Sequence, residues 1–444
     1  MSAPHSATLF SPDGEWVDPA KIAGIRRILA GLGAVGLVLS AVLFLLSATS
    51  AKFAYSWLYA FFFFFSLSLG GLFWVLLHNA SNSGWGIVVR RVWENLACLI
   101  PFLFVLVLPL LVPSVRDNLW EWAREQTEVA RLFPDTVEKG GVSAAIREAA
   151  AQDPHKHLLL HKYAFLNKTF FVIRLILYFA FFGGAALWLR RQSLRQDGDG
   201  ALRWTFRARR GSCGLLPFFA VAATFAAVDL AKTLNYTWFS TMWGVYIFAG
   251  SALGAMAVTI LLVSFLRKLG NLSFIGSEHY HMMGKLTFTF TVFWGYIAFC
   301  QYFLIWYANM TEETQYFLIR NTEGWNDYST FLWIARFVIP FLLLLPAWVK
   351  RTPKYLTAAA LWVLFAHALN VYHIIMPERG VSLLPAGAAA TAPFPFEIWA
   401  LLLDLVAFVT VGACSAFVLL TAFVRHRIYP ARDPRLLESV ALTN

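Results

Sequence analysis

A few ionisable residues stand inside long apolar runs of the sequence, where a charge is costly if the run crosses a membrane. Asp404 lies midway through the run Ile398–Thr410, with no Lys or Arg for many residues on either side. A charge held in hydrocarbon costs about 2.5–3.5 kcal/mol even on the most lenient insertion scale. A carboxyl group desolvated in this way can load and release a proton near neutral pH. Asp404 is therefore either a proton-relay group or an acid that pairs two helices.

Other apolar runs carry one pair of opposite charges and two isolated arginines. Asp229 and Lys232 lie one helical turn apart near the end of a run, so they form either an ion pair on one helix face or an entrance for protons. Arg174 and Arg336 each have no acid within a turn on their own helix. Each arginine therefore needs a partner on another helix, or water, and serves either as a packing anchor or as a functional group.

Three more side chains complete the candidates for a proton path. Glu94 follows Arg90 and Arg91 at the start of an apolar run, which is typical of a salt-bridge partner at a membrane edge. Tyr372 and His373 lie in a later run, where with water they are candidates to link the two buried aspartates. None of these residues forms a recognisable catalytic constellation.

The sequence carries no recognisable site for a metal or a nucleotide. His367 and His373 are six residues apart on one predicted helix and face different ways, and no second helix supplies matched imidazoles for a haem. There is no Gly-rich phosphate loop and no H-E-x-x-H motif. The isolated cysteines, which form no haem, zinc, iron–sulfur or disulfide pattern, are Cys98, Cys213, Cys300 and Cys414. The chain therefore suits a lipophilic small molecule or protons, with no metal redox centre and no covalently bound cofactor of its own.

The composition identifies the class of protein that positions these residues. The chain has 444 residues, of which 59% are hydrophobic and 14% charged, against roughly 25% charged in an ordinary soluble domain. This composition excludes a soluble enzyme, a disordered chain and a fibrous repeat, and it predicts an all-α polytopic membrane protein. The net charge of +11 is then the cytoplasmic excess of Lys and Arg that orients the helices, and it indicates lipid rather than nucleic acid as the surrounding partner.

Windows of about 20 apolar residues predict ten transmembrane helices. They lie near 28–47, 54–78, 93–113, 165–189, 212–231, 242–266, 286–308, 329–349, 355–376 and 396–424. With the N-terminus inside, 22 of the 36 Lys and Arg residues fall in inner segments and 11 in outer ones. Because this excess marks the cytoplasmic side, we expect both termini in the cytoplasm. The polar start of the chain does not resemble a cleaved signal segment, so we expect the first helix to remain in the mature protein.

The spans divide the chain into five parts. We expect a cytoplasmic N-terminal segment (1–27), the first three spans (28–113), a periplasmic segment with interfacial helices (114–164), the remaining seven spans (165–424) and a cytoplasmic tail (425–444). In the periplasmic segment, Trp120, Trp122 and Val129 are expected along the membrane interface. This segment and the acidic loop 310–328 form either a cap on the bundle, a lid, or a surface that binds another subunit.

Two segments of the chain resemble each other. Tyr55–Gly71 and Ser240–Ala255 both begin with clustered aromatic residues and continue into a patch of small residues, with Gly70 set against Gly254. Such self-similarity is typical of doubled membrane bundles. It predicts two four-helix bundles, made of helices two to five and six to nine, flanked by helices one and ten.

Two further segments resemble a known family. The runs GKLTFTFTVFWGYIAFCQYFLIWYANMTEET (Gly284–Thr314) and WFSTMWGVYIFAG (Trp238–Gly250) are similar to the NrfD-like membrane subunits of bacterial alternative complex III. The resemblance covers nearly the whole chain. It implies ten helices in two bundles and a place in the bacterial inner membrane, within a quinol:cytochrome c oxidoreductase of the respiratory chain. One departure is that Met310 and Thr311 replace an Ile-Pro pair usual in the family.

The resemblance is to the ActF type rather than to its paralogue ActC. Helix two reads SLSLGG (Ser66–Gly71) in place of the histidine-containing stretch that adjoins the quinol pocket of the ActC type, whereas Gly84–Asn95 looks like ActF. The resemblance implies an ActC paralogue, an iron–sulfur subunit and multihaem cytochrome subunits as partners, with a terminal oxidase as a further one. Haem and iron–sulfur clusters then belong to the partners, and the missing histidine argues against menaquinone or another quinone here.

Three functions follow from these observations. The first is a non-redox subunit of the quinol-oxidising complex, which supports assembly and in addition conducts protons. The second is a secondary transporter that uses buried acids, although Pro101 and Pro109 in helix three have no counterpart in helix seven. The third, an independent quinol enzyme, needs a redox centre that the sequence lacks.

Overall fold

The structure is a computed structural model that describes residues 14–153, 156–322, 324–382 and 398–442. These residues form helices and no strand, and ten of the helical stretches are long and apolar enough to span a membrane, as predicted. The spans are α1 (Pro19–Leu45), α2 (Ser47–Ala80), α3 (Arg90–Ala97) with α4 (Ile100–Val107) and η2 (Leu108–Leu111), α9 (Lys168–Asp199), α10 (Leu202–Leu230), α11 (Trp243–Lys268), α12 (Ser277–Ala308), α14 (Trp325–Trp333) with η5 (Ile334–Val338) and α15 (Ile339–Leu344), α17 (Pro353–Ser382) and α18 (Ile398–Arg425). Shorter helices connect them, namely η1 (Trp85–Val88), α5 (Pro113–Leu119), α6 (Glu121–Leu132), α7 (Pro134–Gln152), α8 (His157–Lys162), η4 (Lys232–Leu234), α13 (Thr311–Arg320), α16 (Ala347–Arg351) and α19 (Leu436–Val440).

Local sequence signals set several of the helix ends. Asp18 accepts a hydrogen bond from the backbone N–H of Ala20 and precedes Pro19, which suits the first turn of α1. Asn167 caps α9 in the same way. Gly200 ends α9 with φ of +66°, a left-handed conformation that glycine adopts without steric cost. Capping residues therefore set the start of α1 and both ends of α9.

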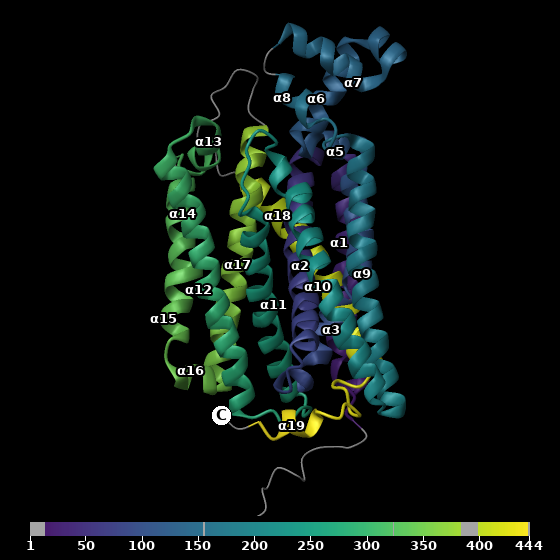
Figure 1. The fold of residues 1–444 in the computed structure, drawn as a ribbon, viewed down its shortest axis with the longest axis vertical. Coiled ribbons are helices and arrows are strands. Elements are labelled where there is room, and N and C mark those ends of the chain that lie inside the picture. The colour runs from purple at the N-terminus through teal and green to yellow at the C-terminus, as the bar shows by residue number, and fades with distance from the viewer. Residues whose placement is uncertain (1–13, 154–155, 323, 383–397, 443–444) are drawn as a thin grey trace, which may run out of the picture.

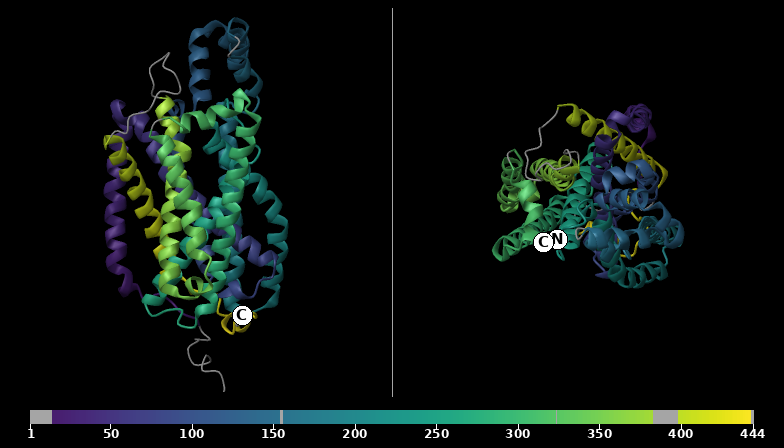
Figure 2. Two further views of the ribbon diagram at one scale, coloured as in Figure 1. Left: turned by 90° about the vertical axis from the view of Figure 1, so that its left-hand side faces the viewer. Right: turned by 90° about the horizontal axis from the view of Figure 1, so that it is seen from above.

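The spans form two neighbouring bundles (Figure 1). In one bundle α2, α3, α4, α9 and α10 pack together, and in the other α11 and α12 pack with α15 and α17. Helices α1 and α18 pack against each other and against α2 at the side (Figure 2). The sequence predicted this arrangement of helices two to five and six to nine, flanked by one and ten.

The two bundles meet where α2 crosses α11, at the small-residue patches matched in the sequence. A Cβ atom on Gly70 would lie 2.1 Å from the backbone oxygen of Ser251, so only glycine permits this approach. On α11, a Cβ atom on Gly254 would lie 2.8 Å from the side chain of Leu67 in α2. Trp74 also donates from its indole N–H to the backbone oxygen of Ala252 at 2.9 Å. Because apolar helices gain little by burying apolar area away from lipid, such close packing is what holds them together.

Two spans are interrupted, at places that do not correspond. The third span breaks between α3 and α4, next to Pro101, whereas its counterpart α12 is continuous. The eighth span contains the π-helical segment η5 just before Pro340. Transporters with inverted repeats usually interrupt helices at matched positions in both halves. The unmatched breaks agree with the absence of a counterpart for Pro101 in helix seven.

Helices α5 to α8 extend beyond the spans at the end opposite the C-terminus (Figure 1). The prediction that Trp120, Trp122 and Val129 lie along the membrane interface is wrong, because all three are buried inside the protein. Both tryptophan rings pack on Phe171 of α9, at centroid distances of 5.0 and 5.4 Å. The apolar face of α6 therefore covers the end of the first bundle instead of facing lipid headgroups.

Candidate functional site

Asp404 has partners that the sequence did not reveal. The guanidinium of Arg379 donates to its carboxylate at 2.7 and 3.3 Å, and Tyr372 donates from its hydroxyl at 3.1 Å. Ser56 of α2 donates a fourth hydrogen bond at 2.6 Å. Although no Lys or Arg lies near Asp404 in the sequence, its charge is therefore compensated by Arg379, 25 residues away. The carboxylate joins α18 to both α17 and α2.

The position of Arg379 explains this difference. The apolar window of the ninth span ends near residue 376, which placed Arg379 in an outer segment. In the structure α17 continues through Pro377 to Ser382, so Arg379 is a buried helical residue, 4% exposed. Tyr372, a candidate to link the two buried aspartates, contacts Asp404.

Asp229 pairs with Arg174 and not with Lys232. The guanidinium of Arg174 donates to the two carboxylate oxygens at 2.8 and 2.9 Å, and Tyr178 adds a hydrogen bond of 2.9 Å. Helix α10 ends at Leu230, and Lys232 begins the separate turn η4, so the helical spacing that predicted an Asp229–Lys232 pair does not exist. The partner that Arg174 required on another helix is this aspartate.

Arg336 forms a hydrogen bond with a histidine and not with an acid. Its Nη2 atom donates to His367 Nδ1 at 3.0 Å, and its guanidinium lies 4.5 Å from the ring centroid of Trp294. Among the described residues, Arg336 Nε and Nη1 are buried and have no hydrogen-bond partner. Arg336 is only 1% exposed, so these two donors require buried water molecules as acceptors.

The hydrogen bonds around His367 determine its tautomer. Arginine can only donate, so His367 Nδ1 accepts and the ring is neutral with its proton on Nε2. That proton points to Ser66 Oγ at 2.8 Å, and the serine hydroxyl in turn donates to the backbone oxygen of Phe63 at 2.7 Å. Ser66, His367 and Arg336 therefore form one directed chain of hydrogen bonds that crosses from the first bundle to the second.

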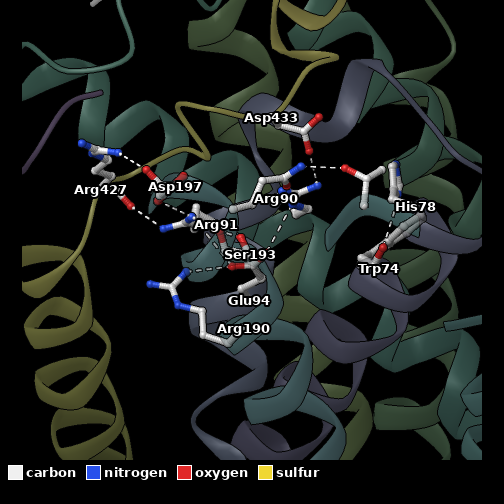
Figure 3. Close-up of polar contacts among 12 residues, drawn as sticks. Trp74, His78, Arg90, Arg91, Glu94, Arg190, Ser193, Asp197, Arg427 and Asp433 are labelled. Atoms are coloured by element: carbon white, nitrogen blue, oxygen red, sulfur yellow. Dashed lines mark hydrogen bonds and ion pairs between the residues drawn. The ribbon is translucent and has the colours of Figure 1, made fainter. Parts of the chain in front are cut away.

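Glu94 is the salt-bridge partner that the sequence predicted. Its carboxylate accepts from Arg190 of α9 at 2.9 Å and lies 3.3 Å from both Arg90 Nε and Arg91 Nε (Figure 3). Three guanidinium groups thus surround one carboxylate that is 2% exposed. Further carboxylates balance the charge, because Asp197 accepts from Arg91.

The C-terminal segment is bound to the same cluster. Asp433 accepts from Arg90 at 2.8 Å, and the backbone oxygen of Arg427 lies within hydrogen-bond distance of Arg91 (Figure 3). Ser439 donates to the backbone oxygen of Trp85 at 2.7 Å. The segment that carries α19 therefore lies across one end of the first bundle and is fixed there by charge.

His373 contributes to an aromatic pocket and not to the Asp404 cluster. Its Nε2 atom lies 2.8 Å from Ser329 Oγ, and its ring stacks on Tyr328. The pocket has a volume of about 280 Å³ and lies between the upper parts of α12 and α14. Its lining includes Trp243, Tyr246, Trp294, Gln301, Tyr302, Arg320, Asn326, Trp333 and His373.

The pocket combines flat apolar walls with one free acceptor. The amide oxygen of Gln301 is buried and has no hydrogen-bond partner among the described residues. A pocket of this size with aromatic walls fits a flat ligand that carries a hydrogen-bond donor. Among the described residues that line it, Arg320 alone is charged, and it is already paired with Glu378 at 3.1 Å, so a neutral ligand is favoured.

A titratable glutamate lies above the bundles, in the layer formed by α5 to α8. Burial and the neighbouring carboxylate of Glu125 raise the pKa of Glu121 from 4.5 to about 7. Glu125 is itself held by Lys156 at 3.1 Å and by the hydroxyl of Tyr236 at 3.0 Å.

The raised pKa of Glu121 predicts that the stability of the chain depends on pH. The folded state holds this proton more tightly than the unfolded state, so its contribution to stability is full below pH 4.5 and is lost as the pH rises through about 7. We expect the melting temperature of the purified protein to fall between about pH 5 and about pH 8, and Glu121→Gln to flatten this fall. Equal slopes in the two proteins would show that Glu121 does not titrate in this range.

Comparison with protein-family models finds no match for the chain, and comparison with curated protein sequences finds none either. The structure brings Asp404 together with Tyr372, and Asp229 with Arg174. It leaves Lys232, Glu94 and His373 outside both of these clusters.

Proposed function

We propose that the chain is an NrfD-like membrane subunit of a quinol:cytochrome c oxidoreductase of the alternative complex III type. In this role it holds partner subunits together in the bacterial inner membrane and conducts protons, while the haem and iron–sulfur centres belong to the partners. The observation that supports the proposal best is the pairing of two four-helix bundles through α2 and α11. This is the plan that the resemblance of Gly284–Thr314 and Trp238–Gly250 implies.

The structure favours a protein-binding role for the layer beyond the spans. Helices α5 to α8 extend beyond the spans at the end away from the C-terminus, and α13 lies at the same end (Figure 1). Leu132 and Leu318 are exposed there, at 73% and 49%. We assign this end to the periplasm and to contact with the ActC paralogue, the iron–sulfur subunit and the multihaem cytochromes.

This orientation has a direct test with two cysteine variants in a Cys213→Ser background. Lys139 in α7 and Ser277 at the start of α12 are both exposed but lie beyond opposite ends of the spans. In intact cells from which the outer membrane has been removed, an impermeant thiol reagent is expected to label Lys139→Cys and not Ser277→Cys. The reverse pattern would place the termini in the periplasm.

Proton conduction is supported by the polar chain in the middle of the bundles. Ser66, His367 and Arg336 link α2, α17 and η5, and the free donors of Arg336 require water. Asp404 and Asp229 sit in satisfied ion pairs at other levels, which favours a role in helix pairing for both. We therefore place the proton path at the Ser66–His367–Arg336 chain.

A quinone does not fit this subunit at the position that the ActC type uses. The corresponding segment of α2, Ser66–Gly71, packs directly on α11. The cavity beside Leu69 and Gly70 has a volume of only about 10 Å³, which is room for one water molecule at most. We therefore propose no quinol chemistry for this segment.

Two observations disfavour the alternative of a secondary transporter. The helix breaks in the third and eighth spans do not lie at matching positions of the two bundles. Asp229 and Asp404 are already paired with arginines, so neither is free to bind a coupling ion. Isolation of the full-length chain from its native membrane separates the two proposals, because a complex subunit is expected to bring iron–sulfur and multihaem proteins with it.

A further inference from the structure

A groove between α9 and α10 gathers positive charge at the end of the bundle that carries the C-terminal segment. It has a volume of about 480 Å³. From α9 it is lined by Trp188, Arg191, Gln192 and Arg195, and from α10 by Arg207, Arg210 and Gly211. The spacings i, i+3, i+4 and i+7 on α9, and i, i+3 and i+4 on α10, place each set on a single helix face. Two facing stripes therefore build the groove.

The charge of the groove is not balanced by the protein. No acidic residue lines it, and its four arginines form no ion pair among the described residues. Neighbouring arginines do have such partners, since Arg190 pairs with Glu94 and Arg203 with Asp199. The four lining guanidiniums therefore attract an anion from outside the chain.

The groove also contains an unused hydrogen-bond acceptor. Gln192 is 5% exposed, and its amide oxygen has no partner among the described residues. An anion alone does not satisfy this oxygen, because an acceptor needs a donor. A ligand that carries both negative charge and a hydroxyl group fits the arrangement better.

The depth of the groove is that of lipid headgroups. The apolar part of α9 ends at Leu189, and the apolar part of α10 begins at Leu215, about one helical turn after Arg210. The Trp188 ring lies over Gly211, where a Cβ atom would be 2.2 Å from it, and provides an apolar floor. Tryptophan at this level is typical of the membrane–water interface, and basic pockets between spans bind anionic lipids.

We propose that this groove binds the headgroup of cardiolipin, in which two phosphates are bridged by a glycerol that carries a hydroxyl group. The four arginines pair with the two phosphates, and the glycerol hydroxyl donates to the free amide oxygen of Gln192. A lipid with one phosphate leaves half of the guanidiniums unpaired, and a zwitterionic lipid adds a repelled cation. The proposal does not depend on the function of the complex.

Native mass spectrometry of the full-length chain in detergent tests this site. The chain is incubated with cardiolipin, phosphatidylglycerol and phosphatidylcholine at equal phosphate concentrations, with and without millimolar inorganic phosphate. Arg191→Gln combined with Arg210→Gln removes one charge from each stripe. The matched control is Arg209→Gln. Arg209 is an exposed arginine of α10 that does not line the groove.

The wild type and Arg209→Gln are expected to retain one cardiolipin in preference to the other two lipids. The double variant is expected to bind it roughly thirtyfold more weakly, on the basis of about 1 kcal/mol for each basic residue near a membrane surface. Equal retention by the double variant, equal retention of phosphatidylglycerol, or displacement by inorganic phosphate would each overturn the proposal. If the double variant does not elute as a monodisperse protein, Arg195→Gln combined with Arg207→Gln removes the other two charges and is held to the same outcomes.

Discussion

Asp404→Asn is expected to destabilise the protein by about 3–5 kcal/mol, because it leaves Arg379 as a buried cation without its carboxylate. Ser56 and Tyr372 also lose an ionised acceptor. The measurement is thermal or denaturant unfolding of the purified chain in detergent. Asp199→Asn is the matched control, since Asp199 forms an exposed pair with Arg203 that solvent screens, so its loss is expected to change stability far less.

A double variant separates a structural role from a proton role. Asp404→Leu combined with Arg379→Met removes both charges and is expected to recover much of the lost stability, because an apolar pair can replace a buried ion pair. If Asp404→Asn instead leaves stability unchanged and lowers the number of protons moved per electron in the assembled complex, Asp404 is a relay group and its assignment to helix pairing is wrong.

Gly70→Ala is expected to have the second large effect, a loss of several kcal/mol or failure to yield a monodisperse protein. The added Cβ atom would lie 2.1 Å from the backbone oxygen of Ser251 and 2.6 Å from the Cβ of Ala255. Helix α11 cannot move this backbone oxygen away without separating from α2. This contact between α2 and α11 is the seam between the two bundles. Size-exclusion elution and the melting temperature in detergent measure the effect.

Gly184→Ala is the control for this substitution. Gly184 lies in α9 and has no atom within 4 Å of a Cβ built on it. Alanine favours a helix interior over glycine by about 1 kcal/mol, so the control is expected to be neutral or stabilising. If Gly70→Ala behaves like the control, the seam is looser than the close approach of α2 and α11 indicates.

The sequence predicted the spans and the two bundles because both depend on local patterns. Apolar windows of membrane length located all ten helices, and the resemblance of two aromatic and small-residue segments predicted the two four-helix bundles. The contact between Gly70 and α11 was not predicted, because it depends on how the two bundles face each other. The need of Arg174 for a partner on another helix was also predictable, because no acid lies within a turn of it. Its identity was not, since it depends on how α9 and α10 face each other.

The errors arose where a helix ends differently from its apolar window. Because α17 continues past Pro377, Arg379 became the partner of Asp404. Because α10 ends at Leu230, Lys232 does not lie on the same helix face as Asp229. The aromatic pocket around Gln301 joins residues of five helices, and no spacing along one helix marks it. The arginine groove is different, since its stripes at i, i+3 and i+4 are visible in the sequence.

The most direct test of the proposed role is affinity purification of the tagged full-length chain from its native membrane in mild detergent, followed by mass spectrometry and a reduced-minus-oxidised spectrum. The proposal predicts an ActC paralogue, an iron–sulfur protein and multihaem cytochromes in fixed proportion to the chain, with all haem absorbance belonging to the cytochromes. Recovery of the chain alone, with no redox partner at any detergent concentration that keeps it folded, would contradict the proposal and favour a transporter.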